Sequence, residues 1–125
     1  MNTRETGNIG EDEVCNFLKK LDYTIIKRNY TIKGGEIDII AQKGEIIAFV
    51  EVKARDINAL SSGFDAITKA KKLRIMKTAQ HYFLNNQCEL QPRFDVAVVE
   101  IKNGKAENIE YIENAYDMSD TNIIF

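Results

Sequence analysis

The stretch Phe49-Val50-Glu51-Val52-Lys53 carries the residues most able to do chemistry in this chain. Side chains alternate along a strand, so Glu51 and Lys53 should point to one face together with Phe49. A carboxylate and an ammonium in so apolar a strand need an explanation, because burying charge costs free energy unless it is paired or bound to metal. The alternative is a salt bridge on a half-exposed sheet, in which Lys53 is a plain counter-ion to Glu51.

A second acidic strand precedes this one and reads Gly35-Glu36-Ile37-Asp38-Ile39-Ile40-Ala41. A hairpin turn around Lys43-Gly44 predicts these cross-strand partners: Ile40 with Ile47, Asp38 with Phe49, and Glu36 with Glu51. In this register the two carboxylates of Asp38 and Glu51 share a face as diagonal neighbours, within roughly 7–8 Å. Neighbouring carboxylates repel, and a cation between them removes the repulsion. Ligands that are all oxygen suit Mg²⁺ or Mn²⁺.

A third acid lies near the N-terminus of the chain. Apolar residues at helical spacing predict a helix from about Ile9 to Leu21. Glu11 falls on its apolar face, which should pack on the sheet, together with Gly7 and Gly10. We therefore expect Glu11 to join the two strand carboxylates at one metal ion. The alternative is that this acid only complements the dipole at the start of the helix.

The remaining hydrophobic pattern predicts the elements that must position these residues. We expect helices at about 9–21 and 65–84, and strands at 23–30, 36–41, 46–53, 94–101 and 108–113. The order predicts an α/β fold with a five-stranded mixed sheet flanked by helices. We expect the chain to form a single domain over residues 1–112, with a C-terminal tail over residues 113–125. Asp95 is expected to hydrogen-bond within the sheet rather than to bind metal.

Basic residues follow the acidic strands. Lys71, Arg74 and Lys77 are spaced to form one stripe along the second helix, where they could contact phosphates. An ordinary solvated helix face is the equal alternative. Arg55 either faces a phosphate or pairs with a neighbouring acid. The segment from Asp56 to Gly63 has the turn residues of a loop, and we expect it to contact a substrate.

The composition of the 125 residues narrows the classes of protein. The net charge of −2 argues against a protein that coats nucleic acid non-specifically, since neutralising phosphates supplies most of that affinity. No apolar run approaches the roughly 20 residues that cross a bilayer, and no secretory signal is recognisable. The two cysteines stand apart, and with a single histidine they make too few ligands for a usual zinc site. We expect free thiols and a cytoplasmic location.

The motifs taken together resemble a known family. The spacing of Asp38 and Glu51-Val52-Lys53 is similar to the PD-(D/E)xK signature of restriction-endonuclease-like nucleases, with Ile37 in place of its proline. The resemblance to the YraN-type family of small bacterial proteins is closer. Three segments match that family in order, namely residues 7–11, 35–41 and 49–55. Ala66-Ile67 with Lys71 and Arg74, and Arg93-Phe94-Asp95-Val96, also match its pattern, which extends to about residue 111.

The resemblance implies a fold like that of archaeal Holliday-junction resolvases, with divalent metal held by a helix Glu and by a strand Asp and Glu. On this chain the implied metal ligands are Glu11, Asp38 and Glu51, with Lys53 orienting or activating water and Glu36 supporting the site. The implied function is a Mg²⁺- or Mn²⁺-dependent endonuclease. It would hydrolyse phosphodiester bonds in DNA, branched or single-stranded, during repair, recombination or processing, and a homodimer is expected.

Two other functions stay open at this point. The same fold could serve as a nucleic-acid-binding module that does not cut. It could also be a protein-interaction scaffold whose charged residues form a structural ion-pair network.

Overall fold

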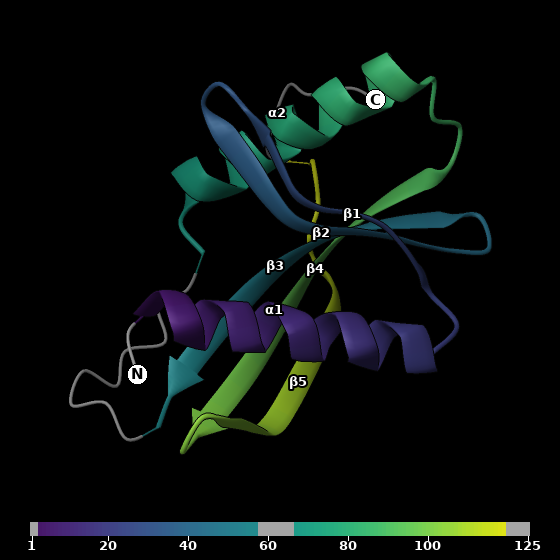
Figure 1. Cartoon of the computed structure of the whole chain (residues 1–125). Helices are drawn as coiled ribbons and strands as arrows, with labels where there is room; N and C mark the ends of the chain where they lie inside the picture. The colour runs from purple at the N-terminus through teal and green to yellow at the C-terminus, as the bar shows by residue number, and fades with distance from the viewer. Residues whose placement is uncertain (1–2, 58–66, 120–125) are drawn as a thin grey trace.

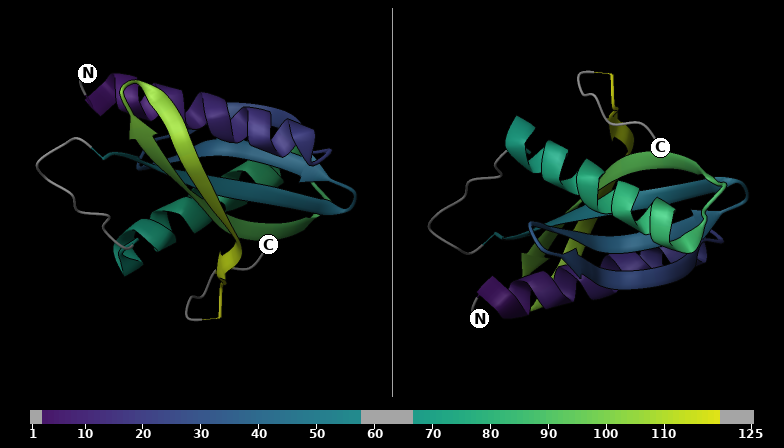
Figure 2. Two further views of the ribbon diagram at one scale, coloured as in Figure 1. Left: turned by 90° about the horizontal axis from the view of Figure 1, so that it is seen from below. Right: turned by 90° about the horizontal axis from the view of Figure 1, so that it is seen from above.

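The computed structural model of the chain describes residues 3–57 and 67–119 (Figure 1). Its elements in chain order are α1 (Thr3–Lys20), β1 (Thr24–Ile32), β2 (Gly35–Lys43), β3 (Ile46–Asp56), α2 (Lys69–Asn86), β4 (Gln91–Lys102) and β5 (Lys105–Tyr116). One mixed sheet in the order β1-β2-β3-β4-β5 lies between α1 on one face and α2 on the other (Figure 2). The expected α/β architecture of the restriction-endonuclease-like type is confirmed.

The strand directions explain where α2 lies. β3 and β4 run parallel, whereas every other neighbouring pair in the described sheet is antiparallel. Parallel neighbours need a crossover connection, and α2 lies on that connection. Thr68 caps the helix by accepting a hydrogen bond from the Lys71 N–H at 3.1 Å. The helix therefore begins at Lys69, four residues after the expected start at residue 65, because the backbone of the capping residue Thr68 is extended.

The register between β2 and β3 differs by two residues from the expected one. Ile40 lies opposite Phe49, and Gln42 lies opposite Ile47. The reason is that the turn is centred on Gly44-Glu45, where Gly44 adopts a left-handed φ of 59°, instead of on Lys43-Gly44. Because side chains alternate with a period of two, a shift of two leaves Asp38 and Glu51 on a common face. The prediction that depends on the shared face is therefore unaffected.

Strand β5 is longer than expected and runs through residue 113 to Tyr116. The Tyr116 ring stacks on Phe94, with ring centroids 5.5 Å apart, and this contact holds the strand end against the face that α2 covers. Residues 120–125 of the expected tail lie outside the described part of the chain.

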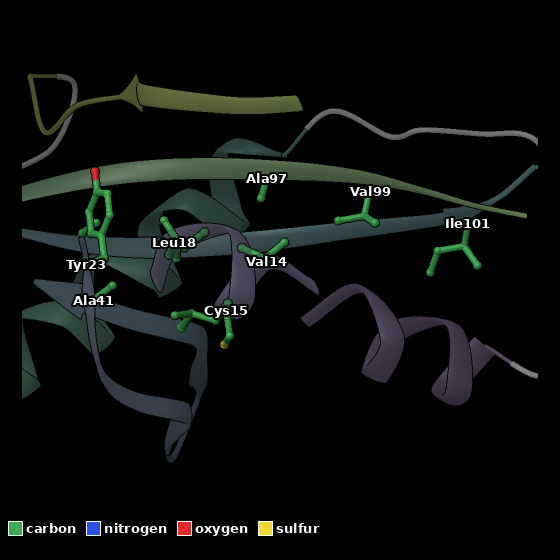
Figure 3. Packing of buried hydrophobic residues seen from close by; sticks show 11 residues of the cluster. Val14, Cys15, Leu18, Tyr23, Ala41, Ala97, Val99 and Ile101 are labelled. Atoms are coloured by element: carbon green, nitrogen blue, oxygen red, sulfur yellow. The ribbon is translucent and has the colours of Figure 1, made fainter. Parts of the chain in front are cut away.

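Each face of the sheet has its own apolar core. On the α1 face, Val14 and Leu18 pack against strand residues that include Val99 (Figure 3). On the α2 face, Phe49 lies at the centre of an aromatic cluster, with ring centroids 5.7–6.2 Å from those of Phe94, Phe83 and Tyr82. Full burial of one such side chain stabilises the fold by about 1.5–3 kcal/mol. No helix in residues 3–57 or 67–119 is long and apolar enough to span a membrane.

Asp95 is fully buried and hydrogen-bonds within the fold, as predicted. Its carboxylate accepts hydrogen bonds from Arg93 Nε at 2.9 Å, from the Tyr111 hydroxyl at 2.5 Å and from the Asn114 N–H at 2.9 Å. Arg93 also donates to the Tyr23 hydroxyl. These groups satisfy the buried charge, so Asp95 has a structural role.

Helix α1 approaches β3 closely at Gly10. A Cβ atom at this position would lie 2.7 Å from the Cβ atom of Ala54 and 3.6 Å from Cγ1 of Val52. The missing side chain therefore sets how close the first half of α1 comes to the sheet.

We predict that Gly10→Ala lowers the free energy of unfolding by about 1–3 kcal/mol, because the added methyl overpacks the contact with β3. Gly7→Ala is the matched control in the same helix, since a Cβ atom there meets nothing within 4 Å. The control should raise helix propensity and stabilise by up to about 1 kcal/mol. Urea denaturation of both variants measures the difference, and equal stabilisation by both would contradict the close approach.

Candidate metal centre

Strands β2 and β3 stop pairing with each other after Ile39 and Val50. Beyond this point β2 stays paired with β1 as far as Gly35, and β3 stays paired with β4 as far as Asp56. The sheet therefore opens into a fork between the β1–β2 hairpin and the β3–β4 pair (Figure 1). The predicted acidic residues of the two strands lie at the base of this fork.

Asp38 lies where the two strands separate, and its side chain replaces a lost strand contact. Its Oδ2 atom accepts a hydrogen bond from the backbone N–H of Val52 at 2.8 Å. A backbone N–H inside a sheet needs an acceptor, and here the carboxylate supplies it in place of a carbonyl of β2. This bond fixes the Asp38 carboxylate against β3, next to Glu51.

Glu51 is buried, with 6% of its side chain exposed, and two lysines neutralise it. Lys71 Nζ of α2 lies 2.6 Å from Glu51 Oε1, and Lys53 Nζ lies 3.9 Å from the same atom. The closer partner is therefore Lys71, which the sequence analysis assigned to phosphate contact. Its pairing with Glu51 was missed because the two residues are 20 positions apart and meet only through the crossover.

The electrostatics of the fork follow from this crowding. Burial, and then the negative charge of Glu51, raise the pKa of Asp38 to about 7. Burial, and then the positive charge of Lys71, lower the pKa of Lys53. Two neighbouring carboxyl groups, with a lysine ammonium already paired with one of them, are a donor set that fits a divalent cation.

The third expected ligand, Glu11, does not join this pair. Its Oε1 atom lies 3.7 Å from Nη2 of Arg28 on β1, and the same Arg28 nitrogen lies 2.9 Å from Asp12. Burial raises the pKa of Glu11, and its charge contributes to raising that of Asp38. Within the described ranges, no three His, Cys, Asp or Glu side chains are grouped closely enough to hold one metal ion. The structure brings two of the three expected carboxylates together.

A hollow of about 140 Å³ lies over the fork on the α2 side, and we call it the fork hollow. It is lined by Gly35, Glu36, Asp38, Glu51, Lys71, Arg74 and Ile75. Among the other predicted residues, Glu36 and Arg74 are thus part of the site. Glu36 also accepts a hydrogen bond from Thr31 at 3.0 Å.

The other predicted basic residues lie outside the fork hollow. Lys77 is exposed further along α2 and does not line it. Arg55 lines a separate cavity of about 330 Å³ with Val98 and Glu100, and its buried Nε atom has no hydrogen-bond partner among the described residues. Residues 58–63 of the expected substrate loop lie outside the described residues. Both cysteines are free thiols, with Cys15 buried and Cys88 half-buried.

The raised pKa of Asp38 predicts a pH dependence of stability in the absence of metal. The folded state holds this proton up to about pH 7, whereas the unfolded chain releases it near pH 4. The contribution of Asp38 to stability is thus fully present below pH 4 and is lost as the pH rises toward 7 and above. Asp38→Asn keeps an acceptor oxygen for Val52 and cannot ionise. In EDTA it should exceed wild type by a few kcal/mol at pH 8, with little difference at pH 4.

Urea denaturation at both pH values measures this effect. Asp22→Asn removes an exposed carboxylate from a turn and controls for the general loss of one negative charge. The same advantage of Asp38→Asn at pH 4 and pH 8 would show that Asp38 is not the titrating group.

Comparison with known proteins agrees with the resemblance to the YraN-type family. A family model described as "Uncharacterised protein family UPF0102" matches residues 10–99. A UPF0102 protein of Dictyoglomus thermophilum is 38% identical over 118 residues, which cover 93% of this chain and 100% of the relative. A UPF0102 protein of Alkaliphilus metalliredigens is 42% identical over 115 residues, covering 91% and 99%. One of Fusobacterium nucleatum is 45% identical over 96 residues, covering 76% and 81%. The match to the family model and the identity to these relatives show that the chain, which carries the fork of two carboxylates and two lysines, belongs to the UPF0102 family.

Proposed function

We propose that this protein is a Mg²⁺- or Mn²⁺-dependent endonuclease that hydrolyses phosphodiester bonds in DNA, with the fork as its active site. The observation that carries the proposal is the pair of crowded carboxylates, Asp38 and Glu51, at the base of a hollow with cationic side chains. Carboxylates hold a cation and cations attract a phosphate, so the hollow has the charges that phosphodiester cleavage needs.

Asp38 and Glu51 would hold the ion. Glu11 is the third ligand implied by the family resemblance, and it would have to leave its ion pair with Arg28 to take that role. An ion held by these residues would supply a water molecule of lowered pKa and would neutralise charge on the phosphate. Glu36 lines the same hollow and would support the carboxylates from β2.

The lysines have separate tasks in this proposal. Lys53 has a lowered pKa and lies beside Glu51, so it can orient the attacking water and exchange a proton with it. Lys71 neutralises Glu51 in the free protein. With a divalent ion held at Glu51, the ammonium of Lys71 would be free to contact the phosphate, and Arg74 lines the same hollow. The phosphate contacts expected of Arg55 and Lys77 stay predictions.

One observation favours a second function, a nucleic-acid-binding module that does not cut. Glu11 is paired with Arg28, so only two of the three expected carboxylates, Asp38 and Glu51, meet at the fork. A site that lacks its third ligand would keep the basic residues for binding and lose catalysis. In either case the proposed partner of the protein is DNA, and the proposed location is the cytoplasm. The homodimer expected from the resolvase likeness stays a prediction.

We predict metal-dependent cleavage of DNA by the wild-type chain and none by Asp38→Ala, because that variant lacks a carboxylate for the ion. The assay uses branched, flapped and single-stranded DNA with Mg²⁺ or Mn²⁺, and an EDTA sample defines the background. Asp22→Asn should cleave like wild type. Equal cleavage by wild type and Asp38→Ala would remove the proposed active site, and tight binding of DNA without any cleavage would favour the second function.

A separate prediction concerns the ion alone. Mn²⁺ should raise the melting temperature of the wild-type chain at pH 8, with a stabilisation of about 2.7 kcal/mol at 100 times the Kd. Lys71→Met should be less stable than wild type without metal, because Glu51 loses its closest counter-ion. It should gain more from Mn²⁺, because no ammonium competes with the ion. Thermal unfolding with and without Mn²⁺ tests both statements. No effect of Mn²⁺ on wild type would favour a structural ion-pair network.

A further inference from the structure

A larger cavity lies beside α2 near the end of β5. It has a volume of about 450 Å³, within the range of about 300–1,000 Å³ that is usual for ligand sites. Its lining includes Lys69, Lys72, Leu73 and Met76 of α2, together with Tyr116 and Asp117. We call it the Tyr116 cavity. None of these residues belongs to the fork hollow.

The two hollows share the first turn of α2. Lys71 lines the fork hollow, whereas its neighbours Lys69 and Lys72 line the Tyr116 cavity. Burial, and then the negative charge of Glu51, raise the pKa of the Tyr116 hydroxyl, which agrees with a position near the fork. A substrate strand bound at the fork would therefore pass close to the Tyr116 cavity.

The Tyr116 side chain offers an aromatic ring to a ligand. Its ring is held against Phe94, with ring planes 20° apart, and Lys72 Nζ lies 5.3 Å from the ring centroid. Its hydroxyl is buried and has no hydrogen-bond partner among the described residues. Because the hydroxyl is buried, the ring is the part of Tyr116 that a ligand in the cavity would contact.

The lining also carries charge suited to a phosphate. Lys69 and Lys72 contribute two ammonium groups, and the long side chain of Lys72 can leave the ring to follow an anion. The one acid of the lining, Asp117, accepts a hydrogen bond from the Ser119 N–H at 2.9 Å. An aromatic ring and two cations together match a nucleotide, which has a flat base and an anionic phosphate.

We propose that the Tyr116 cavity binds one unpaired nucleotide of the substrate strand, with its base on Tyr116 and its phosphate near Lys69 and Lys72. A base within a duplex is stacked on both faces and cannot enter such a hollow without leaving the stack. The cavity thus makes the protein select DNA that has a single-stranded stretch beside the cleavage point. This inference rests on the proposed function, because it assumes that the fork receives DNA.

The test compares two labelled oligonucleotides of equal charge, a thymidine 12-mer and a 12-mer of the same backbone without bases. Fluorescence anisotropy with the full chain in EDTA measures binding without cleavage. Wild type should bind the thymidine 12-mer about 5- to 100-fold more tightly, since stacking of a base on an aromatic side chain has an effect of this size. Equal binding of the two by wild type would overturn the inference, and this comparison needs no variant.

Tyr116→Leu should lose most of this preference and bind the 12-mer without bases as wild type does. Tyr30→Leu is the matched control, because Tyr30 packs against the opposite end of α2, with its ring 5.5 Å from that of Tyr82. The control should keep the preference. A preference retained by a folded Tyr116→Leu would overturn the inference.

The outcomes separate this inference from the proposed function. Metal-dependent cleavage by a wild type that binds both 12-mers equally would overturn only the nucleotide site. A clear preference for the thymidine 12-mer without cleavage of any DNA would overturn only the proposed nuclease activity.

Discussion

The hydrogen bond from the Val52 N–H to the Asp38 carboxylate is the contact on which the rest of the site depends. A sheet that divides in two leaves backbone groups without partners, and such groups are costly away from water. Here the carboxyl group of Asp38 meets that need, so an ionisable acid is built into the sheet by the demands of its backbone. The neighbouring Glu51 then makes the charge density high enough that cationic groups must gather around it.

Helix α2 supplies the closest of those cationic groups, and its position is set by packing. It meets β2 at Gly35, where a Cβ atom would lie 2.0 Å from Oγ1 of Thr78 and 3.1 Å from the carbonyl oxygen of Arg74. The aromatic cluster around Phe49 holds the other half of the helix. The close contact and the apolar cluster together bring Lys71 to Glu51. The chemistry of the site is therefore linked to the core beneath it.

Local patterns in the sequence were enough to predict the helices and strands and the shared face of the two acidic strand residues. The period of two along residues 35–41 and 49–53 placed Asp38 and Glu51 on one face, and this held although the register was wrong by two residues. Contacts between distant elements were not predictable in the same way. The pairs Lys71–Glu51 and Arg28–Glu11 depend on the orientation of the crossover and of the first hairpin relative to the rest of the fold. A periodic sequence pattern carries no information about that orientation. The extension of β5 to Tyr116 depends likewise on contacts with β4, among them the pairing and the ring stacking of Tyr116 with Phe94.

The parallel direction of β3 and β4 has a consequence for how proteins of this architecture can diverge. The chain leaves β3 at Asp56, beyond the fork, and re-enters the described structure at Ile67, just before the helical turn that carries Lys71. One end of the intervening segment thus follows β3, which carries Glu51 next to Asp38, and the other end precedes the turn of α2 whose Lys71 pairs with Glu51. Insertions or substitutions there could change which molecules reach those acids and leave the folding of the domain intact. Substrate choice and fold stability are in this way open to separate selection.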